Sequence, residues 1–229
     1  MSKDYRQFCG LSRAAAVLGE RWALLLVRDL TVGARRFTDL QAGLPGIPAA
    51  VLTARLRELE GAGIVRRAPG PARGMLYELT ARGNELEPIL DALGRWGALT
   101  MEEPRDSEVV TDASLAAALR SARVSVAVPH SFTVHVRSGG AEAWAAVHDE
   151  GVVVGPGEPQ RDADLVLDAG PQLRLLLAGT LTPDEALASG DLAITGDRRL
   201  LDTFVHAFRV PLAAHSPHES AHHLTPHAT

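Results

Sequence analysis

The chain has 229 residues, of which 46% are hydrophobic and 22% charged, and its formal net charge is −5. This composition is typical of a globular protein and excludes a disordered or fibrous one. The longest apolar run, residues 22–27, is far shorter than the roughly 20 residues that cross a bilayer, and no apolar signal segment opens the chain, so we expect a cytoplasmic protein without membrane association.

The charge is divided unevenly along the chain. Residues 1–105 carry 15 Lys and Arg against 12 Asp and Glu, whereas residues 106–229 carry 8 against 16. A difference of this size indicates two modules with different partners. Polar residues and a proline between the two suggest a linker. We predict a first domain over residues 1–103, a second over 109–210, and a His-rich disordered tail over 211–229.

The first half predicts a mainly α-helical domain with one hairpin. In one of its helices, Leu52, Leu56 and Leu59 recur along one face. The expected elements are helices over 14–30, 37–42 and 48–62, strands over 64–68 and 76–79, and a helix over 86–101. This is the element order of a winged helix-turn-helix. The helix over 14–30 is apolar on most faces, so we expect it to be largely buried.

The second half predicts an α+β domain. Phe132, Val134 and Val136 alternate with polar residues, as in a half-buried strand. Residues 182–185 form a capping box with proline at the first helical position. The expected elements are a helix after Thr111, strands over 132–136, 143–148, 152–154 and 163–167, helices over 172–178 and 182–189, a strand over 192–195 and a helix over 197–208.

A winged helix presents one helix to the major groove of double-stranded DNA and its hairpin to an adjacent groove or to the backbone. Cations occur at the three places that this fold brings to one surface: the turn before the short helix, the outward face of the 48–62 helix, and the wing. The candidate DNA-binding residues are Arg35, Arg36, Ala50, Thr53, Arg55, Arg57, Arg66, Arg67 and Arg73. The plainer interpretation is a solvated surface with scattered arginines.

An ordered series of motifs supports the first interpretation. Residues 19–22 are Gly-Glu-Arg-Trp, 36–40 are Arg-Phe-Thr-Asp-Leu, 52–60 are Leu-Thr-Ala-Arg-Leu-Arg-Glu-Leu-Glu, and 63–66 are Gly-Ile-Val-Arg. From residue 9 to 97 the chain resembles the HxlR family of bacterial winged-helix regulators. The resemblance implies a homodimeric transcription factor that binds an inverted repeat. Its dimerisation residues would be those of the N-terminal segment together with Leu86, Ile89, Leu90, Leu93 and Trp96.

The chain departs from the family in the helix expected to read DNA. The family usually has a serine where Pro48 stands and polar residues in the first turns, where Ala50 and Ala54 stand. Alanine cannot hydrogen-bond to a base edge and can only contact thymine methyl groups. We therefore predict that sequence reading depends on Thr53 and Arg55, on the wing arginines and on DNA shape.

Cys9 is the only cysteine, which excludes an intrachain disulfide and a thiolate zinc cluster. In some relatives the cysteine at this place senses oxidants or electrophiles, often by bonding its counterpart across the dimer. Arg6 and Arg13 lie near Cys9 in the sequence and would favour its thiolate. One alternative function is therefore redox sensing through Cys9, with a purely scaffolding C-terminal domain. The other interpretation of Cys9 is an inert thiol.

The second half contains no arrangement of nucleophile, base and metal ligands, so we expect no enzyme, no cofactor and no metal site. Residues 162–168, 175–187 and 189–197 resemble the sterol carrier protein domain, which encloses an apolar tunnel for lipids. The resemblance implies a small apolar effector. Candidate pocket residues are Phe132, Trp144, Leu165, Leu176, Leu187, Phe204 and Phe208, which would otherwise simply pack the core. A further alternative is a lipid-carrier or interaction protein whose DNA-binding surface has decayed.

Overall fold

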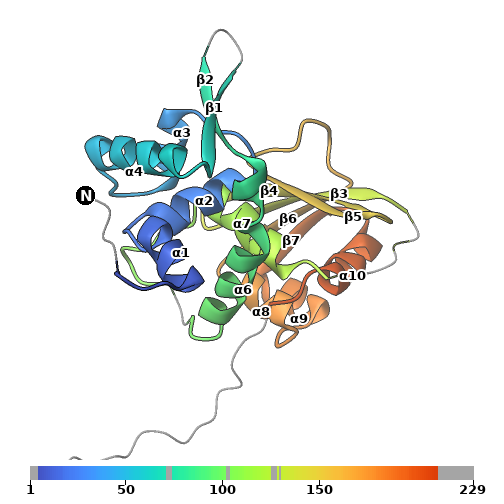
Figure 1. Ribbon diagram of the computed structural model, residues 1–229. Helices are drawn as coiled ribbons and strands as arrows, with labels where there is room; N and C mark the ends of the chain where they lie inside the picture. The colour runs from blue at the N-terminus through green and yellow to red at the C-terminus, as the bar shows by residue number, and fades with distance from the viewer. Residues whose placement is uncertain (1–4, 71–73, 102–103, 125–127, 129, 211–229) are drawn as a thin grey trace, which may run out of the picture.

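The computed structural model describes residues 5–70, 74–101, 104–124, 128 and 130–210 (Figure 1). Arg73 of the predicted wing and the predicted tail, 211–229, lie outside the described residues. Within the described part of the chain, no helix is both long and apolar enough to span a membrane. The buried apolar side chains form two clusters, one in each half, which we call the N-terminal core and the C-terminal core.

The first half forms the predicted winged helix-turn-helix. Its elements are α1 (Gly10–Leu18), α2 (Ala23–Thr31), α3 (Phe37–Gly43), α4 (Ala49–Gly61), β1 (Val65–Pro69), β2 (Met75–Leu79), α5 (Ala81–Asn84) and α6 (Glu87–Ala98). Leu52, Leu56 and Leu59 are all buried in the N-terminal core, as their spacing predicts. Strands β1 and β2 pair antiparallel and project as a wing beyond α4 (Figure 1).

The prediction of one helix over residues 14–30 is wrong. Helix α1 ends at Leu18 and α2 begins at Ala23, because Trp22 adopts φ +79°, a left-handed conformation through which a helix cannot continue. At Gly19 a Cβ atom would lie 2.5 Å from the carbonyl oxygen of Ala15, so the turn needs glycine there. The segment is also less buried than predicted, since Leu24 and Leu25 of α2 are exposed.

The second half is the predicted α+β domain. Its elements are α7 (Asp112–Ala122), β3 (Phe132–Ser138), β4 (Ala141–His148), β5 (Gly151–Pro156), β6 (Leu165–Ala169), α8 (Leu173–Ala178), α9 (Pro183–Ser189), β7 (Leu192–Gly196) and α10 (Arg198–Ala207). The strands form one sheet in the order β5-β4-β3-β6-β7, in which β3 and β6 are parallel and the other neighbours antiparallel.

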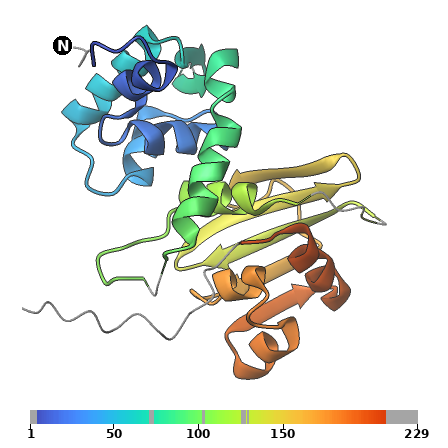
Figure 2. The same ribbon diagram turned by 60° about the horizontal axis from the view of Figure 1, so that its bottom comes forward.

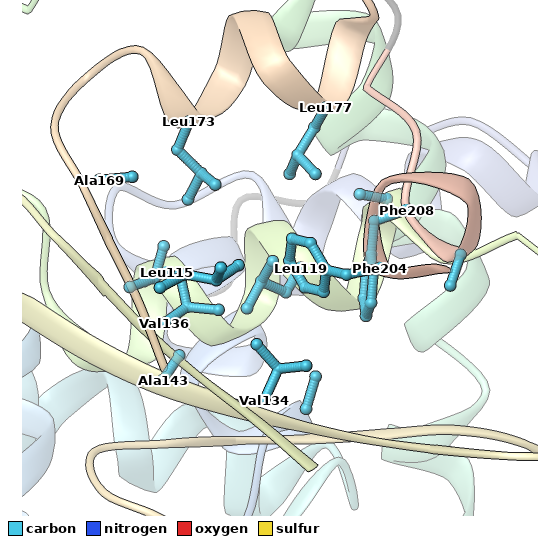
Figure 3. Packing of buried hydrophobic residues seen from close by; sticks show 14 of the residues in the cluster. Leu115, Leu119, Val134, Val136, Ala143, Ala169, Leu173, Leu177, Phe204 and Phe208 are labelled. Atoms are coloured by element: carbon cyan, nitrogen blue, oxygen red, sulfur yellow. The ribbon is translucent and has the colours of Figure 1, made fainter. Parts of the chain in front are cut away.

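The C-terminal core lies between one face of this sheet and the helices (Figure 3). Leu115 and Leu119 of α7 point toward Val134 and Val136 of β3, and Figure 3 shows side chains of α8 and of the end of α10 entering the same core. The rings of Phe204 and Phe208 lie 4.7 Å apart between their centroids. Burying these side chains on a single face stabilises the sheet and its helices as one unit.

Helix α7 joins the two halves of the chain. It packs against α2, α3 and α6 on one side and against β4 and β5 on the other. At its N-terminus, the Thr111 hydroxyl donates to the carbonyl of Gly43 in α3 at 3.4 Å, and Asp112 accepts a hydrogen bond from the backbone of Glu142 in β4 at 2.8 Å. Figure 2 shows the helical half at one end of the molecule and the sheet at the other, with α6 reaching between them.

Candidate nucleic-acid interface

The three cationic places predicted from the sequence are tied together by backbone and side-chain contacts. Arg35, in the turn before α3, exchanges two backbone hydrogen bonds with Tyr77 of β2, at 2.9 and 2.7 Å. Tyr77 pairs in turn with Arg67 of β1. The side chain of Arg67 reaches Glu60 in the last turn of α4. Turn, wing and α4 therefore lie side by side at one end of the molecule (Figure 1).

We call the described cations of these three places the arginine surface. Its members are Arg35, Arg36, Arg55, Arg57, Arg66 and Arg67. Arg36, Arg57, Arg66 and Arg67 are exposed, whereas Arg35 and Arg55 are partly buried. Ala50 and Ala54 are exposed on the same side of α4, so this helix presents methyl groups beside its cations. Exposed arginines next to a helix free on one face suit contacts to DNA phosphates.

The two residues predicted to read sequence are both engaged within the protein. The Thr53 hydroxyl donates to the carbonyl of Ala49 at 2.9 Å. The guanidinium of Arg55 pairs with Glu58 in the same helix and, at 3.2 Å, with Glu20 in the turn between α1 and α2. Glu20 could not be predicted as a partner from the sequence, because it lies 35 positions away from Arg55. The Thr53 oxygen can still accept a hydrogen bond from a base, whereas the guanidinium of Arg55 must leave Glu20 or Glu58 in order to contact a base with two nitrogens.

We expect Thr53→Ala and Arg55→Ala each to reduce the preference for the operator over random DNA by about fivefold to a hundredfold, since a lost base contact costs about 1–3 kcal/mol. The operator can be selected from a random duplex library with the wild-type protein. Fluorescence anisotropy at constant salt then measures both affinities. Arg198→Ala is the control, because Arg198 pairs with Asp184 and Asp202 in the other domain. Unchanged operator preference in both test variants would show that neither residue reads sequence.

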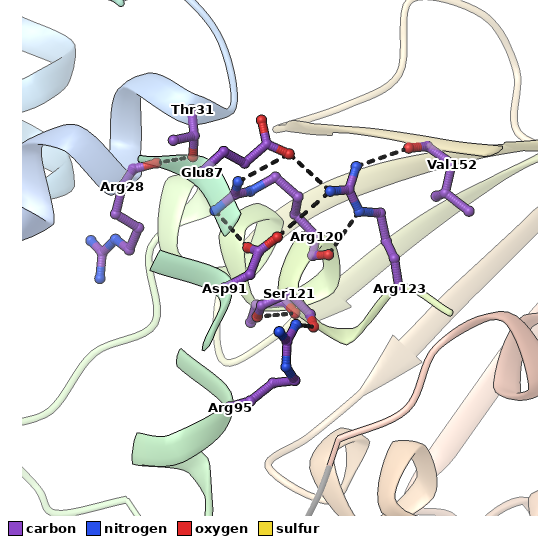
Figure 4. A network of polar contacts seen from close by, with 10 residues as sticks. Arg28, Thr31, Glu87, Asp91, Arg95, Arg120, Ser121, Arg123 and Val152 are labelled. Carbon is purple, nitrogen blue, oxygen red and sulfur yellow. Dashed lines mark hydrogen bonds and ion pairs between the residues drawn. The ribbon is translucent and has the colours of Figure 1, made fainter. Parts of the chain in front are cut away.

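A second polar cluster links α6 to α7 (Figure 4). The side chain of Arg120 in α7 is 4% exposed and lies 2.9 Å from Asp91 and 3.3 Å from Glu87, both in α6. Arg123 lies 2.9 Å from the same Glu87 oxygen and donates to the carbonyl of Val152 in β5 at 3.3 Å. We call these four charged residues, Glu87, Asp91, Arg120 and Arg123, the α6–α7 network. It connects the winged helix to the sheet domain.

Burial dominates the electrostatics of Asp91. Removal from water raises the pKa of its carboxyl group, while Arg120 and Arg123 lower that pKa, and the net direction is upward. The two cations therefore compensate only part of the cost of burying the charge. The α6–α7 network could not be predicted from the sequence, because its members lie in two helices separated by the predicted linker.

The predicted dimerisation residues divide into two groups. Leu86 and Leu90 pack against the N-terminal core of their own chain. Ile89, Leu93 and Trp96 are exposed, and Trp96 shows 74% of its surface. Further exposed apolar residues in the first two helices and the segment before them are Phe8, Leu11, Leu24 and Leu25. Apolar side chains exposed in such numbers are typical of an interface with another protein.

The predicted pocket residues belong mostly to the C-terminal core. Leu187 is half-buried and packs against this core. Five others are buried in it: Phe132, Leu165, Leu176, Phe204 and Phe208. Trp144 is different, because along β4 it alternates with the buried Ala143 and Ala145. Its ring instead covers Gly155 of β5, where a Cβ atom would come within 2.5 Å. Trp144 therefore lies on the other face of the sheet from the pocket candidates that are buried in the C-terminal core.

Cys9 precedes the first residue of α1 and is exposed. Hydrogen bonds from the backbone of Ser12 and Leu11 lower the pKa of its thiol from the usual value. Among the described residues, no three His, Cys, Asp or Glu side chains gather in a way that could hold a metal ion.

Comparison with known proteins is consistent with this geometry. Residues 17–105 match a protein family described as HxlR-like helix-turn-helix. The HTH-type transcriptional regulator YvaP of Bacillus subtilis is 38% identical over 86 residues, which are 37% of this chain and 80% of YvaP. The HTH-type transcriptional regulator sll1512 of Synechocystis sp. is 37% identical over 97 residues, 42% of this chain and 72% of that protein. Among solved structures, the redox regulator HypR in its oxidised form is 32% identical, with a TM-score of 0.39, and the match covers 42% of this chain and 100% of HypR.

Proposed function

Because the chain belongs to the family of HxlR-like helix-turn-helix transcriptional regulators, we propose that it acts as a homodimer on an inverted repeat in double-stranded DNA and that its C-terminal domain receives a small apolar effector. The observation that carries the DNA-binding part is the arginine surface, in which cations from three separate segments lie beside the free face of α4. Cations grouped in this way suit contacts to the phosphates on both sides of a groove.

The exposed apolar residues of α6 and of the first two helices support the homodimer. A twofold dimer presents two copies of α4 and therefore matches the twofold symmetry of an inverted repeat. Trp96 and Leu93 would be the centre of the contact, because large apolar side chains contribute most of the binding energy of an interface.

The sheet supports the effector part of the proposal. Its strand order, with helices covering one face and an apolar core between, fits the resemblance to the sterol carrier protein domain in residues 162–197. The α6–α7 network supplies a physical route between the two domains, because α6 carries the exposed dimerisation residues and α7 lies on the sheet. An effector regulates DNA binding only if it binds one arrangement of these elements better than the other.

A salt series of DNA binding tests the first part. The full-length protein is expected to retain a duplex of its own promoter region in a gel, with an affinity that falls steeply between about 50 and 200 mM salt, by a slope of about −0.9 for each phosphate contacted. No retention at the lowest salt would contradict DNA binding. That result would favour the alternative of a carrier protein whose DNA-binding surface has decayed, consistent with the methyl groups of Ala50 and Ala54.

Native mass spectrometry of freshly purified protein tests the other two parts. The expected spectrum shows a dimer that carries additional mass from a bound apolar molecule, which organic extraction releases. A dimer without additional mass, whose extract contains no apolar compound, would contradict the effector while leaving DNA binding in place.

A second candidate function is redox sensing through Cys9, favoured by its exposure and by the lowered pKa of its thiol. Two Cys9 thiols, one from each protomer, would lose two protons and two electrons to hydrogen peroxide, forming a disulfide and two molecules of water. We expect peroxide to produce a reducible covalent dimer of the wild type but not of Cys9→Ser. If Cys9→Ser loses the effect of peroxide on DNA binding while apolar compounds have none, redox sensing replaces the effector. An identical peroxide response in Cys9→Ser would exclude it.

A further inference from the structure

Half of the arginine surface is neutralised by carboxylates of the same domain. Three of its six members form ion pairs: Arg55 with Glu20 and Glu58, Arg66 with Glu78, and Arg67 with Glu60. Among the described residues, Arg36 and Arg57 have no such partner. The surface proposed to bind DNA therefore presents fewer free cations than its sequence suggests.

The pair between Arg67 and Glu60 has the best geometry. Arg67 Nε lies 2.9 Å from Glu60 Oε1, and Arg67 Nη2 donates to Glu60 Oε2 at 3.1 Å. Two parallel contacts of this kind use one whole edge of the guanidinium, the edge that would otherwise bind two phosphate oxygens. The guanidinium also lies 5.7 Å from the centre of the Tyr77 ring, which helps to hold it in place.

The position of Glu60 makes this pairing favourable. Glu60 lies in the last turn of α4, where the free carbonyl groups of the helix already carry a partial negative charge. A carboxylate at this position is repelled unless a cation compensates it, and in the structure Arg67 is that cation. A phosphate that approaches Arg67 must displace the carboxylate and then lie beside it. Arg67 therefore adds little to loose, purely electrostatic contact with DNA.

Loose and tight complexes differ in how firmly the duplex is held. In a non-specific complex the backbone is mobile, and a phosphate competes poorly with a bidentate carboxylate. On an operator, the contacts of α4 hold the backbone close to the wing, so the exchange of carboxylate for phosphate costs less entropy. Building on the proposed DNA-binding function, we propose that Glu60 is a specificity-determining residue, which keeps Arg67 in a neutral pair on random DNA and releases it to phosphate on the operator.

Glu60→Gln tests this assignment, because glutamine keeps the shape of the side chain and removes its charge. Anisotropy titrations of the full-length variant use a random duplex and the selected operator, each of about 30 base pairs, enough for two half-sites. We expect the affinity for random DNA to rise about threefold to fivefold, as for the loss of one surface ion pair, with a salt slope steeper by about 0.9. Operator affinity is expected to change less, so that the ratio of the two affinities falls.

Two control variants separate the ion pair from the change in net charge. Glu85→Gln removes the same charge from the same domain, at an exposed residue with no ion pair among the described residues, and is expected to leave random-DNA affinity unchanged. The double variant Glu60→Gln/Arg67→Gln is expected not to show the rise in random-DNA affinity that Glu60→Gln shows, because that rise comes from the released Arg67. Glu78→Gln breaks the single contact of 2.7 Å between Arg66 and Glu78, and is expected to raise the affinity for random DNA less than Glu60→Gln does.

The outcomes distinguish this inference from the proposed function. The role of Glu60 would be overturned, with DNA binding itself unaffected, by any of three results. These are an unchanged affinity of Glu60→Gln for random DNA, an equal rise of that affinity in Glu85→Gln, or a rise that persists in the double variant without Arg67. A wild-type protein that binds neither duplex at the lowest salt would overturn DNA binding itself.

Discussion

Replacing Arg120 with methionine is expected to lower the free energy of unfolding by about 3–5 kcal/mol, the usual cost of removing one partner from a buried ion pair. Methionine fills most of the volume of the arginine stem, so the loss comes from charge and not from a cavity. Without the guanidinium, Asp91 and Glu87 remain together at the α6–α7 contact, compensated by the more exposed Arg123 and, for Asp91, by Arg95. Urea denaturation measures the change.

Arg123→Met is the matched control for this prediction. Arg123 contacts the same two carboxylates, but its side chain is 32% exposed, so its loss is expected to cost only about 1 kcal/mol. The double variant Arg120→Met/Asp91→Asn removes the buried cation and its nearest carboxylate charge together, and should recover more than half of the lost stability. If Arg120→Met costs no more than Arg123→Met, the α6–α7 network contributes nothing beyond a surface pair.

The same variant has a defined pH dependence. Burial already raises the pKa of Asp91 in the folded protein, and removing Arg120 takes away the largest of the causes that lower it. A carboxyl group whose folded pKa lies above its unfolded value, about 3.9, binds protons more tightly in the folded state. Its contribution to stability is therefore present at low pH and lost as the pH rises through the folded pKa. The stability deficit of Arg120→Met relative to wild type should accordingly grow as the pH is raised above about 4.

Local features of the fold could be predicted from the sequence. The spacing of Leu52, Leu56 and Leu59 fixes which face of α4 is buried, and the hydroxyl of Thr182 accepts a hydrogen bond from the backbone of Glu185 at 3.2 Å, as its capping box predicts. Such features depend on residues within one or two turns of each other. The break at Trp22 is an exception, because no glycine or proline immediately adjoins it and only the tertiary structure holds its backbone at positive φ.

Two features could not be predicted from the sequence: ion pairs between residues far apart in the chain, and which face of the sheet the helices cover. The alternation in β4 separates Trp144 from Ala143 and Ala145, and hydrophobicity alone would place the tryptophan inside. The alanines are inside because α7, itself rich in buried alanines, packs directly against β4 and leaves no room for a large ring. Similarly, Arg55 meets Glu20 only because α4 packs beside the turn after α1. For that reason the sequence indicated where the cations lie but not which of them are already paired.

Replacing Leu93 and Trp96 together with aspartate is expected to convert the protein to a monomer. Both side chains are exposed on α6, so each chain keeps its own core and the variant should fold normally. Two aspartates at the centre of the proposed interface would be buried without partners in a dimer, which makes association unfavourable. Light scattering after size-exclusion chromatography measures the mass, and far-UV circular dichroism checks the fold.

Loss of the dimer is also expected to lower operator affinity, on the order of a hundredfold, because a monomer binds one half-site and loses the high effective concentration of the second DNA-binding surface. Val153→Asp is the control: Val153 is an exposed apolar residue of β5 in the other domain, and its replacement should leave both mass and operator affinity unchanged. A Leu93→Asp/Trp96→Asp protein that remains dimeric would locate the interface elsewhere on the chain. A monomeric variant with undiminished operator affinity would instead show that DNA is bound by single chains, and the inverted repeat would no longer follow from the fold.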